Sequence, residues 1–252
     1  MKKIKLLLCL FMLTTLCGCS NSNKNESSKT LNAAMFWIST SLDPTNNYDG
    51  WVLSRIGVGE TLLKLNEKYE VEPCLAKSYE QIDDTTWKLT LKDSITFSND
   101  KKVTGENVKS CLERAFEKNT RAIDYFDLNH VEAKGQDIYL YLNKSSGAIL
   151  NNLCEPLFTI YDASQSEEDI ANHPLCTGPF VVDDFVSEKT IDTSKNKKYY
   201  DGKAKLDHVH FSQVTDSDAR VLALQSGEVD LANTIDYSSL KLFRNNKDYQ
   251  VL

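Results

Sequence analysis

The stretch from Thr86 to Phe116, TWKLTLKDSITFSNDKKVTGENVKSCLERAF, holds a strand pattern, a turn region and a helix pattern in immediate succession. In residues 86–92, tryptophan and leucine alternate with lysine and threonine, which predicts a strand with one buried and one wetter face. Residues 94–102 carry Ser-Asn-Asp turn chemistry and end that strand. This part of the chain is therefore expected to supply a strand to a sheet that packs on a core.

The helix pattern begins at a recognisable cap. Thr104 has the side chain of an N-cap, and Glu106 places a negative charge in the first turn. The apolar residues that follow recur at helical spacing and share one face: Val108, Leu112, Ala115 and Phe116. A strand and an amphipathic helix next to each other favour a fold that mixes both kinds of element.

Strands and helices continue to alternate on both sides of this stretch. Strands are expected at residues 30–39, 63–65, 128–133, 137–143, 156–161, 179–186, 188–194, 206–213 and 229–235. Helices are expected at 51–62, at 217–226 between Asp216 and Gly227, and after Asp236. Because no long run of one type occurs, the predicted class is α/β in the mixed, α+β sense.

Composition excludes several classes of protein. The chain has 252 residues, more than the ~150 of a typical domain, so two structural units are expected. Hydrophobic residues make up 41% and charged residues 26%, which excludes collagen, a coiled coil and a wholly disordered chain. The net charge is −7 and no run of five lysines or arginines occurs, so we expect no nucleic-acid partner.

The first 18 residues have the pattern of a secretory leader. Lysines at the start precede an apolar run of about 13 residues, which is shorter than the ~20 needed to span a bilayer. Leu16-Cys17-Gly18-Cys19 resembles a bacterial lipobox, which implies lipidation at Cys19 and a two-chain membrane anchor. Residues 19–29 are polar and are expected to form a flexible tether. The alternative is an ordinary signal peptide with a loose mature terminus.

Four cysteines remain after the leader and the lipidation site Cys19: Cys74, Cys111, Cys154 and Cys176. None forms a C-x-x-C pair, so the zinc and thioredoxin signatures are absent from the sequence. Disulfide bonds and free buried thiols are both open interpretations, because spacing alone does not choose a connectivity.

Short motifs follow one another along the chain in a recognisable order. They are Leu42-Asp43-Pro44, Gly59-Glu60-Thr61-Leu62-Leu63, Pro73-Cys74-Leu75-Ala76-Lys77-Ser78-Tyr79, Thr86–Lys92, Ile95–Asn99, Val103–Val108, Thr177-Gly178-Pro179-Phe180, Asn196–Gly202, Leu206–Phe211 and Ala223–Asp230. Together they resemble solute-binding protein family 5, the substrate-binding lipoproteins of peptide- and nickel-type ABC transporters.

The resemblance implies a periplasmic-binding-protein fold of type II, cluster C. Residues 30–65 and 170–252 would form a first lobe, and residues 66–169 would form a subdomain inserted in it. Members of the family are about twice as long, so we expect the second lobe to be missing and the chain to be truncated or fragmentary. The function implied is that of an extracytoplasmic, lipid-anchored component that captures a small peptide or a nickel complex for an ABC importer.

The family binds its ligand in the cleft between lobes, and the resemblance places several residues there. They are Asn46, Tyr48, Trp51, Arg55, Tyr125, Glu155 and Thr177. Aromatic walls, amides and one arginine suit a polar small ligand, and an arginine can pair with a carboxylate through two hydrogen bonds. The alternative is that Tyr48 and Trp51 only pack at the start of a helix.

Other kinds of site and function remain to be weighed. His208 and His210 flank the apolar Val209 on an expected strand, which indicates an exposed face, so we expect no metal ligands and no cofactor. No serine-hydrolase, zinc-protease or P-loop motif is present in the sequence, so no enzyme is expected. The alternative functions are a lipoprotein hydrolase of peptide or cell-wall fragments, or a surface interaction protein. The expected partners are a permease, an ATPase and the membrane, on its extracytoplasmic face.

Overall fold

The structure, a computed structural model, describes residues 28–244 and 246–252. The predicted leader, Cys19 and all but the last two residues of the predicted tether lie outside the described residues. Within the described ranges, none of the helices combines the length and the apolar character that crossing a membrane requires.

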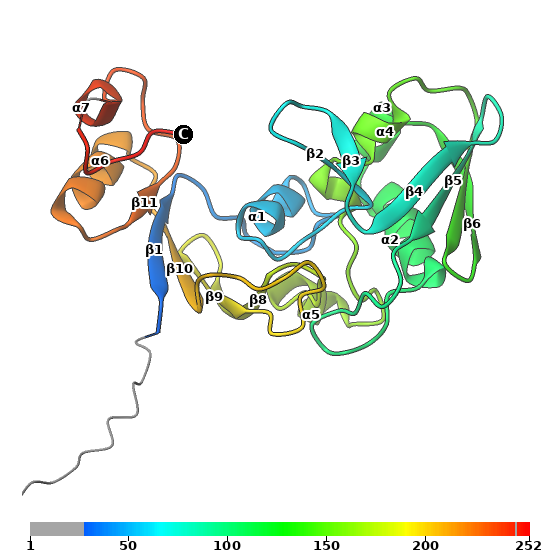
Figure 1. Ribbon diagram of the computed structural model, residues 1–252, viewed down its shortest axis with the longest axis horizontal. Coiled ribbons are helices and arrows are strands. Elements are labelled where there is room, and N and C mark those ends of the chain that lie inside the picture. The colour runs from blue at the N-terminus through cyan, green and yellow to red at the C-terminus, as the bar shows by residue number, and fades with distance from the viewer. Residues whose placement is uncertain (1–27, 245) are drawn as a thin grey trace, which may run out of the picture.

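A five-stranded sheet forms one side of the molecule (Figure 1). Its strands are ordered β11-β1-β10-β9-β8, and β1 runs parallel to both of its neighbours, whereas the pairs with β9 are antiparallel. Helix α6 packs beside β11 at the edge. The elements are β1 (Thr30–Met35), β8 (Phe180–Val186), β9 (Thr190–Lys195), β10 (His208–Gln213), β11 (Leu231–Ala232), α6 (Ser217–Ser226) and α7 (Lys241–Arg244).

A four-stranded antiparallel sheet forms the other side, in the order β4-β5-β7-β6. Its apolar face packs against α2. Leucine and isoleucine alternate with other residues in β5 and β7, and these leucine and isoleucine side chains are buried. The elements are β4 (Ala76–Gln81), β5 (Thr86–Leu91), β6 (Leu128–Lys134), β7 (Asp137–Leu142) and α2 (Gly105–Lys118).

The remaining elements are short, and several of them connect the two sheets. Figure 1 shows α1 between them. The elements are α1 (Asp49–Arg55), a hairpin of β2 (Leu63–Leu65) and β3 (Val71–Pro73), α3 (Ala122–Tyr125), α4 (Ile149–Asn152), the 3₁₀ turn η1 (Pro156–Phe158) and α5 (Glu167–Asn172).

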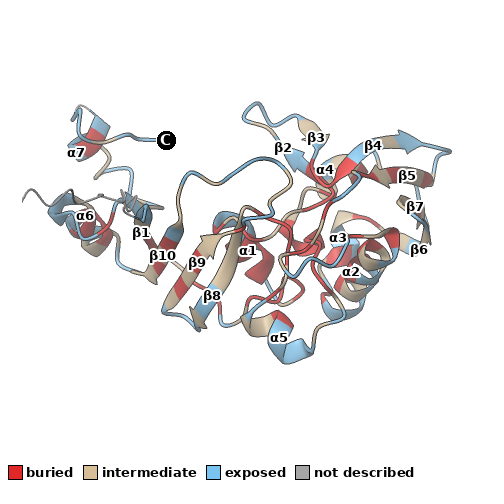
Figure 2. Ribbon diagram, turned by 60° about the horizontal axis from the view of Figure 1, so that its bottom comes forward, coloured by how far each residue is buried: buried red, intermediate tan, exposed pale blue. Residues whose placement is uncertain are grey.

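One hydrophobic core extends from sheet to sheet. It includes Phe211 of the five-stranded sheet, Leu53 of α1 and Leu89 of the four-stranded sheet. In Figure 2, α1 and the segments around it are mostly buried and lie in the middle of the molecule. Burial at roughly 25 cal/mol per Å² of apolar surface makes this shared core the main force that holds the two sheets to α1.

Several local expectations are confirmed. The strand at 86–92 is observed as β5, and Thr104 caps α2 with a full capping box that includes Asn107. Helix α6 has the predicted bounds, begins at the Asp216 side chain and ends at Gly227, whose φ of 75° suits glycine. The mixed α/β class is therefore observed.

Three element predictions are wrong. The helix expected at 51–62 is α1, which ends at Arg55 because Gly57 takes a φ of 71° and turns the chain. The strand expected at 156–161 begins as η1, since Pro156 has no N–H to give to a strand ladder. The helix expected directly after Asp236 begins only at Lys241, because residues 236–240 form turns.

The four cysteines within the described residues, Cys74, Cys111, Cys154 and Cys176, are free thiols, and all but Cys154 are buried. Burial is the main cause that raises the pKa of Cys74 and of Cys111 to about 12, so both thiols stay protonated.

In β10, Val209 and Phe211 face the core, whereas His208 is exposed and His210 Nδ1 lies 2.7 Å from Asp192 Oδ1. The predicted orientation of this strand is confirmed.

Candidate functional site

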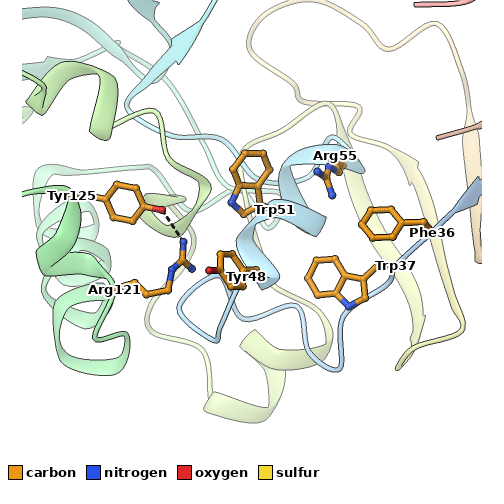
Figure 3. Close-up of a pocket in the computed structure, with 7 residues that line it drawn as sticks. All are labelled: Phe36, Trp37, Tyr48, Trp51, Arg55, Arg121 and Tyr125. Carbon is orange, nitrogen blue, oxygen red and sulfur yellow. Dashed lines mark hydrogen bonds between the residues drawn. The ribbon is translucent and has the colours of Figure 1, made fainter. Parts of the chain in front are cut away.

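A cavity of about 630 Å³ lies at the carboxyl end of β1. Parallel strands commonly place ligands at this end, and β1 is parallel to both of its neighbours. Five of the seven lining side chains are aromatic and two are arginines. In Figure 3 they come from the residues after β1, from α1 with the residue before it, and from α3 with its cap. They are Phe36, Trp37, Tyr48, Trp51, Arg55, Arg121 and Tyr125.

The loop between β1 and α1 is held by a buried ion pair. Arg114 of α2 donates two hydrogen bonds to the Asp43 carboxylate, at 2.9 and 2.6 Å, and a third at 2.7 Å to the Thr45 hydroxyl. The Asn119 amide donates to the Thr45 and Asn47 carbonyls at 3.0 and 3.1 Å. These contacts fix the chain directly before Tyr48 and so place the start of α1.

The carboxyl groups of Asp43, in this loop, and of Asp49, the first residue of α1, differ in their acidity. Burial alone would raise the pKa of Asp43, but the hydrogen bonds from Arg114 and Thr45 outweigh burial and hold that pKa below its usual value. Burial raises the pKa of Asp49 to about 6, because the single hydrogen bond from Asn46 offsets burial only in part. The loop and the first turn of α1 therefore hold one carboxylate that stays ionised and one that titrates near neutrality.

Each arginine of the pocket lies over an aromatic ring. The Arg121 guanidinium lies 3.7 Å from the centre of the Tyr48 ring and donates to the Tyr125 hydroxyl at 2.7 Å (Figure 3). The Arg55 guanidinium lies 5.3 Å from the centre of the Trp51 ring. Cation–π contacts of this kind orient a guanidinium group without neutralising its charge.

Glu155 lies beside the pocket, next to Trp51. The Trp51 indole Nε1 donates to its carboxylate Oε1 at 2.8 Å, and Arg121 Nη2 lies 3.7 Å from the same oxygen. Burial, and after it the nearby Glu155 charge, raises the pKa of Tyr125, so this phenol remains a neutral hydrogen-bonding group. The arrangement suits binding of a small polar ligand with flat or apolar parts.

Comparison with known proteins places the chain in a family. The family description "Bacterial extracellular solute-binding proteins, family 5 Middle" matches residues 70–252, well over half of the chain. The chain belongs to family 5 of the bacterial extracellular solute-binding proteins. The resemblance read from the motifs is therefore confirmed.

Individual relatives agree with this family 5 assignment. The nickel-binding protein NikA of Staphylococcus aureus is 33% identical over 236 residues, which cover 94% of this chain and 47% of NikA. The glutathione-binding protein GsiB of Salmonella paratyphi A is 26% identical over 201 residues, 76% of this chain and 39% of GsiB. The chain spans about half the length of the curated relatives it matches, or less.

A solved structure confirms the fold class. The crystal structure of S. aureus NikA in complex with Ni(L-His)2 superposes with a TM-score of 0.81 at 32% identity, covering 87% of this chain and 46% of that one. The chain thus has the mixed α/β fold of a family 5 periplasmic binding protein over about half of such a protein.

The structure brings four of the predicted site residues together in the pocket of this family 5 chain: Tyr48, Trp51, Arg55 and Tyr125. Asn46 lies just outside and donates to Asp49 at 2.6 Å. Thr177 lies elsewhere: it is buried and donates at 2.7 Å to Glu60, which lines a second cavity of about 420 Å³.

The sequence reasoning missed three lining residues. Phe36 and Trp37 directly follow β1, and an aromatic pair at the end of a parallel strand could have indicated them. Arg121 reaches the pocket from the cap of α3, more than seventy residues after Tyr48, and no local pattern marks it.

Proposed function

We propose that this chain is the ligand-binding part of an extracytoplasmic, lipid-anchored substrate-binding protein that serves an ABC importer. The ligand is a small peptide or a nickel complex, and the partners are a permease and an ATPase. The pocket of aromatic rings and two arginines at the carboxyl end of β1 is the observation that carries this proposal. The relatives' names, one nickel-binding and one glutathione-binding, support both ligand classes.

The chemistry of the lining favours a chelated ion over a bare one. None of the seven lining side chains is a histidine, cysteine, aspartate or glutamate, the groups that usually coordinate nickel. A nickel ion in this pocket would therefore take its ligands from the small molecule that carries it. The carboxylates of such a molecule would pair with arginine, and its flat rings would stack on the aromatic walls.

The same proposal includes the division of the chain into a first lobe, residues 30–65 and 170–252, and an inserted subdomain, residues 66–169. All four strands of the four-stranded sheet belong to the inserted subdomain, and all five strands of the other sheet belong to the first lobe. The pocket draws on both units, because Phe36 to Arg55 belong to one and Arg121 and Tyr125 to the other.

Isothermal titration calorimetry tests the proposal with three probes: the bis-histidine nickel(II) complex, glutathione and nickel(II) chloride alone. We expect saturable binding of at least one of the first two and weaker binding of the bare ion. Arg55→Gln should weaken that binding about tenfold, the loss of roughly one charge-assisted hydrogen bond, whereas the exposed control Lys205→Gln should not.

The proposed function would be contradicted if neither the bis-histidine nickel complex nor glutathione bound. It would also be contradicted if Arg55→Gln and Lys205→Gln bound the ligand with equal affinity. Product formation from a peptide probe would instead support the hydrolase alternative.

A further inference from the structure

Glu155 lies directly behind the side chains that line the pocket. It does not belong to the seven lining residues, and its side chain is only 13% exposed. It directly precedes η1, which packs on α1 so closely that a side chain at Gly50 would overlap the Pro156 carbonyl oxygen. This close packing brings the Glu155 carboxylate against the side of α1 that carries Trp51.

Side chains from two other elements converge on this carboxylate. Its Oε1 accepts the indole N–H of Trp51 at 2.8 Å and lies 3.7 Å from Arg121 Nη2. The same Arg121 nitrogen donates to the Tyr125 hydroxyl at 2.7 Å. One mostly buried carboxylate thus links α1 to the cap and the last residue of α3, and the three linked side chains all line the pocket.

The two arginines of the pocket differ in their charge environment. Arg121 faces Glu155 within ion-pair distance. Arg55, in the part of the chain that the structure describes, has no carboxylate within 4.0 Å and lies against the Trp51 ring. Because the Glu155 carboxylate lies 3.7 Å from Arg121 and both side chains are largely shielded from water, it offsets most of the Arg121 charge. Arg55 therefore presents a stronger positive field to a ligand than Arg121 does.

We propose that Glu155 is a positioning residue of the pocket. It holds Trp51 and Arg121 in place, and its charge offsets that of Arg121, so that Arg55 presents the one uncompensated positive charge of the lining. One consequence, which rests on the proposed function, is that the pocket prefers neutral or singly charged ligands over dianions. It assigns Glu155 a role behind the wall in place of the ligand contact expected from the sequence.

Fluorescence quenching tests the charge arrangement without any ligand. Iodide reports the local positive potential at the pocket tryptophans, whereas neutral acrylamide reports only access. Glu155→Gln keeps an oxygen for the Trp51 indole but removes the charge, so the iodide quenching constant should rise roughly two- to threefold at low salt and fall back at high salt. The acrylamide constant should not change.

Two further variants separate the charge effect from a structural one. Glu113→Gln removes the same charge from an exposed ion pair with Lys109 on α2 and should leave the iodide constant unchanged. Adding Arg121→Gln to Glu155→Gln removes both charges of this ion pair and should return the iodide constant to the wild-type value. An iodide constant that does not respond to Glu155→Gln, or that rises together with the acrylamide constant, overturns the inference.

Ligand preference provides the second readout. In Glu155→Gln the affinity for the dianionic nickel–EDTA complex should rise about threefold or more relative to that for the neutral bis-histidine complex. A preference that moves the other way overturns the inference. If the wild-type chain binds neither of these complexes nor glutathione, the proposed function fails, and the iodide measurement still decides the role of Glu155.

Discussion

The bidentate ion pair between Asp43 and Arg114 should be among the most costly contacts of the chain to break. The Asp43 and Arg114 side chains are 12% and 11% exposed, and the pair joins the loop before α1 to α2. Asp43→Asn leaves the guanidinium buried with its partner charge removed. Because removal of one member of a buried pair costs about 3–5 kcal/mol, we expect the free energy of unfolding to fall by about 3 kcal/mol at pH 7.

Arg114 offers an internal control, because it also contacts Glu167 at 2.6 Å, and that carboxylate is 67% exposed. Glu167→Gln should cost less than about 1 kcal/mol, as exposed ion pairs do. Urea unfolding followed by tryptophan fluorescence measures both variants. Equal losses for Asp43→Asn and Glu167→Gln, or a loss under 1 kcal/mol for Asp43→Asn, would refute the reasoning.

The pH dependence of the same pair has a definite sign. The pKa of Asp43 is depressed in the folded state, so its contribution is present above the unfolded value near 3.9 and is lost as the pH falls through the folded value. The destabilisation caused by Asp43→Asn should therefore shrink as the solution becomes acidic. A difference that stays constant down to the acid limit would contradict this account.

Two further substitutions test other parts of the structure. The pKa of Asp49 is raised to about 6, so the free energy of unfolding of the wild-type chain falls as the pH rises from about 4 to 6. Asp49→Asn should therefore be about 1–3 kcal/mol more stable than the wild-type chain at pH 8 and no more stable near pH 4. Urea unfolding measures both, and a loss of stability at pH 8 would count against this reasoning. Gly50→Ala should lower the free energy of unfolding by about 2–3 kcal/mol, because its new methyl group would overlap the Pro156 carbonyl. Gly147→Ala is the control, since its methyl group meets no neighbour within 4 Å and should leave stability almost unchanged. Equal melting temperatures for the two variants would contradict the packing of α1 on η1.

Elements with a clear local signal could be predicted from the sequence. The alternation in β5 and the Thr104 cap of α2 are properties of neighbouring residues, and the structure has both. The end of α1 was mispredicted because apolar residues continue beyond Arg55 at a spacing that also fits a helix. Only the left-handed backbone of Gly57, which lets Phe180 pack against it, shows that the helix has ended.

The candidate site was less predictable than the fold. Tyr48, Trp51 and Arg55 lie within one turn region and its helix, so a single motif could indicate all three. Arg121 and Glu155 meet those residues only through the packing of α3 and η1 on α1, contacts between positions far apart in the sequence. No periodicity or spacing encodes such a meeting, and so Arg121 was missed and Glu155 was assigned to the ligand.

The central claim is that ligand binds in the pocket at the carboxyl end of β1, and indole NMR tests it most directly. The three tryptophans report on two places, since Trp37 and Trp51 line the pocket whereas Trp87 lies in β5 of the other sheet. Titration with the bis-histidine nickel complex or glutathione should shift or broaden the indole resonances of Trp37 and Trp51 and leave that of Trp87 unchanged. Saturable binding with both pocket resonances unmoved would contradict the account.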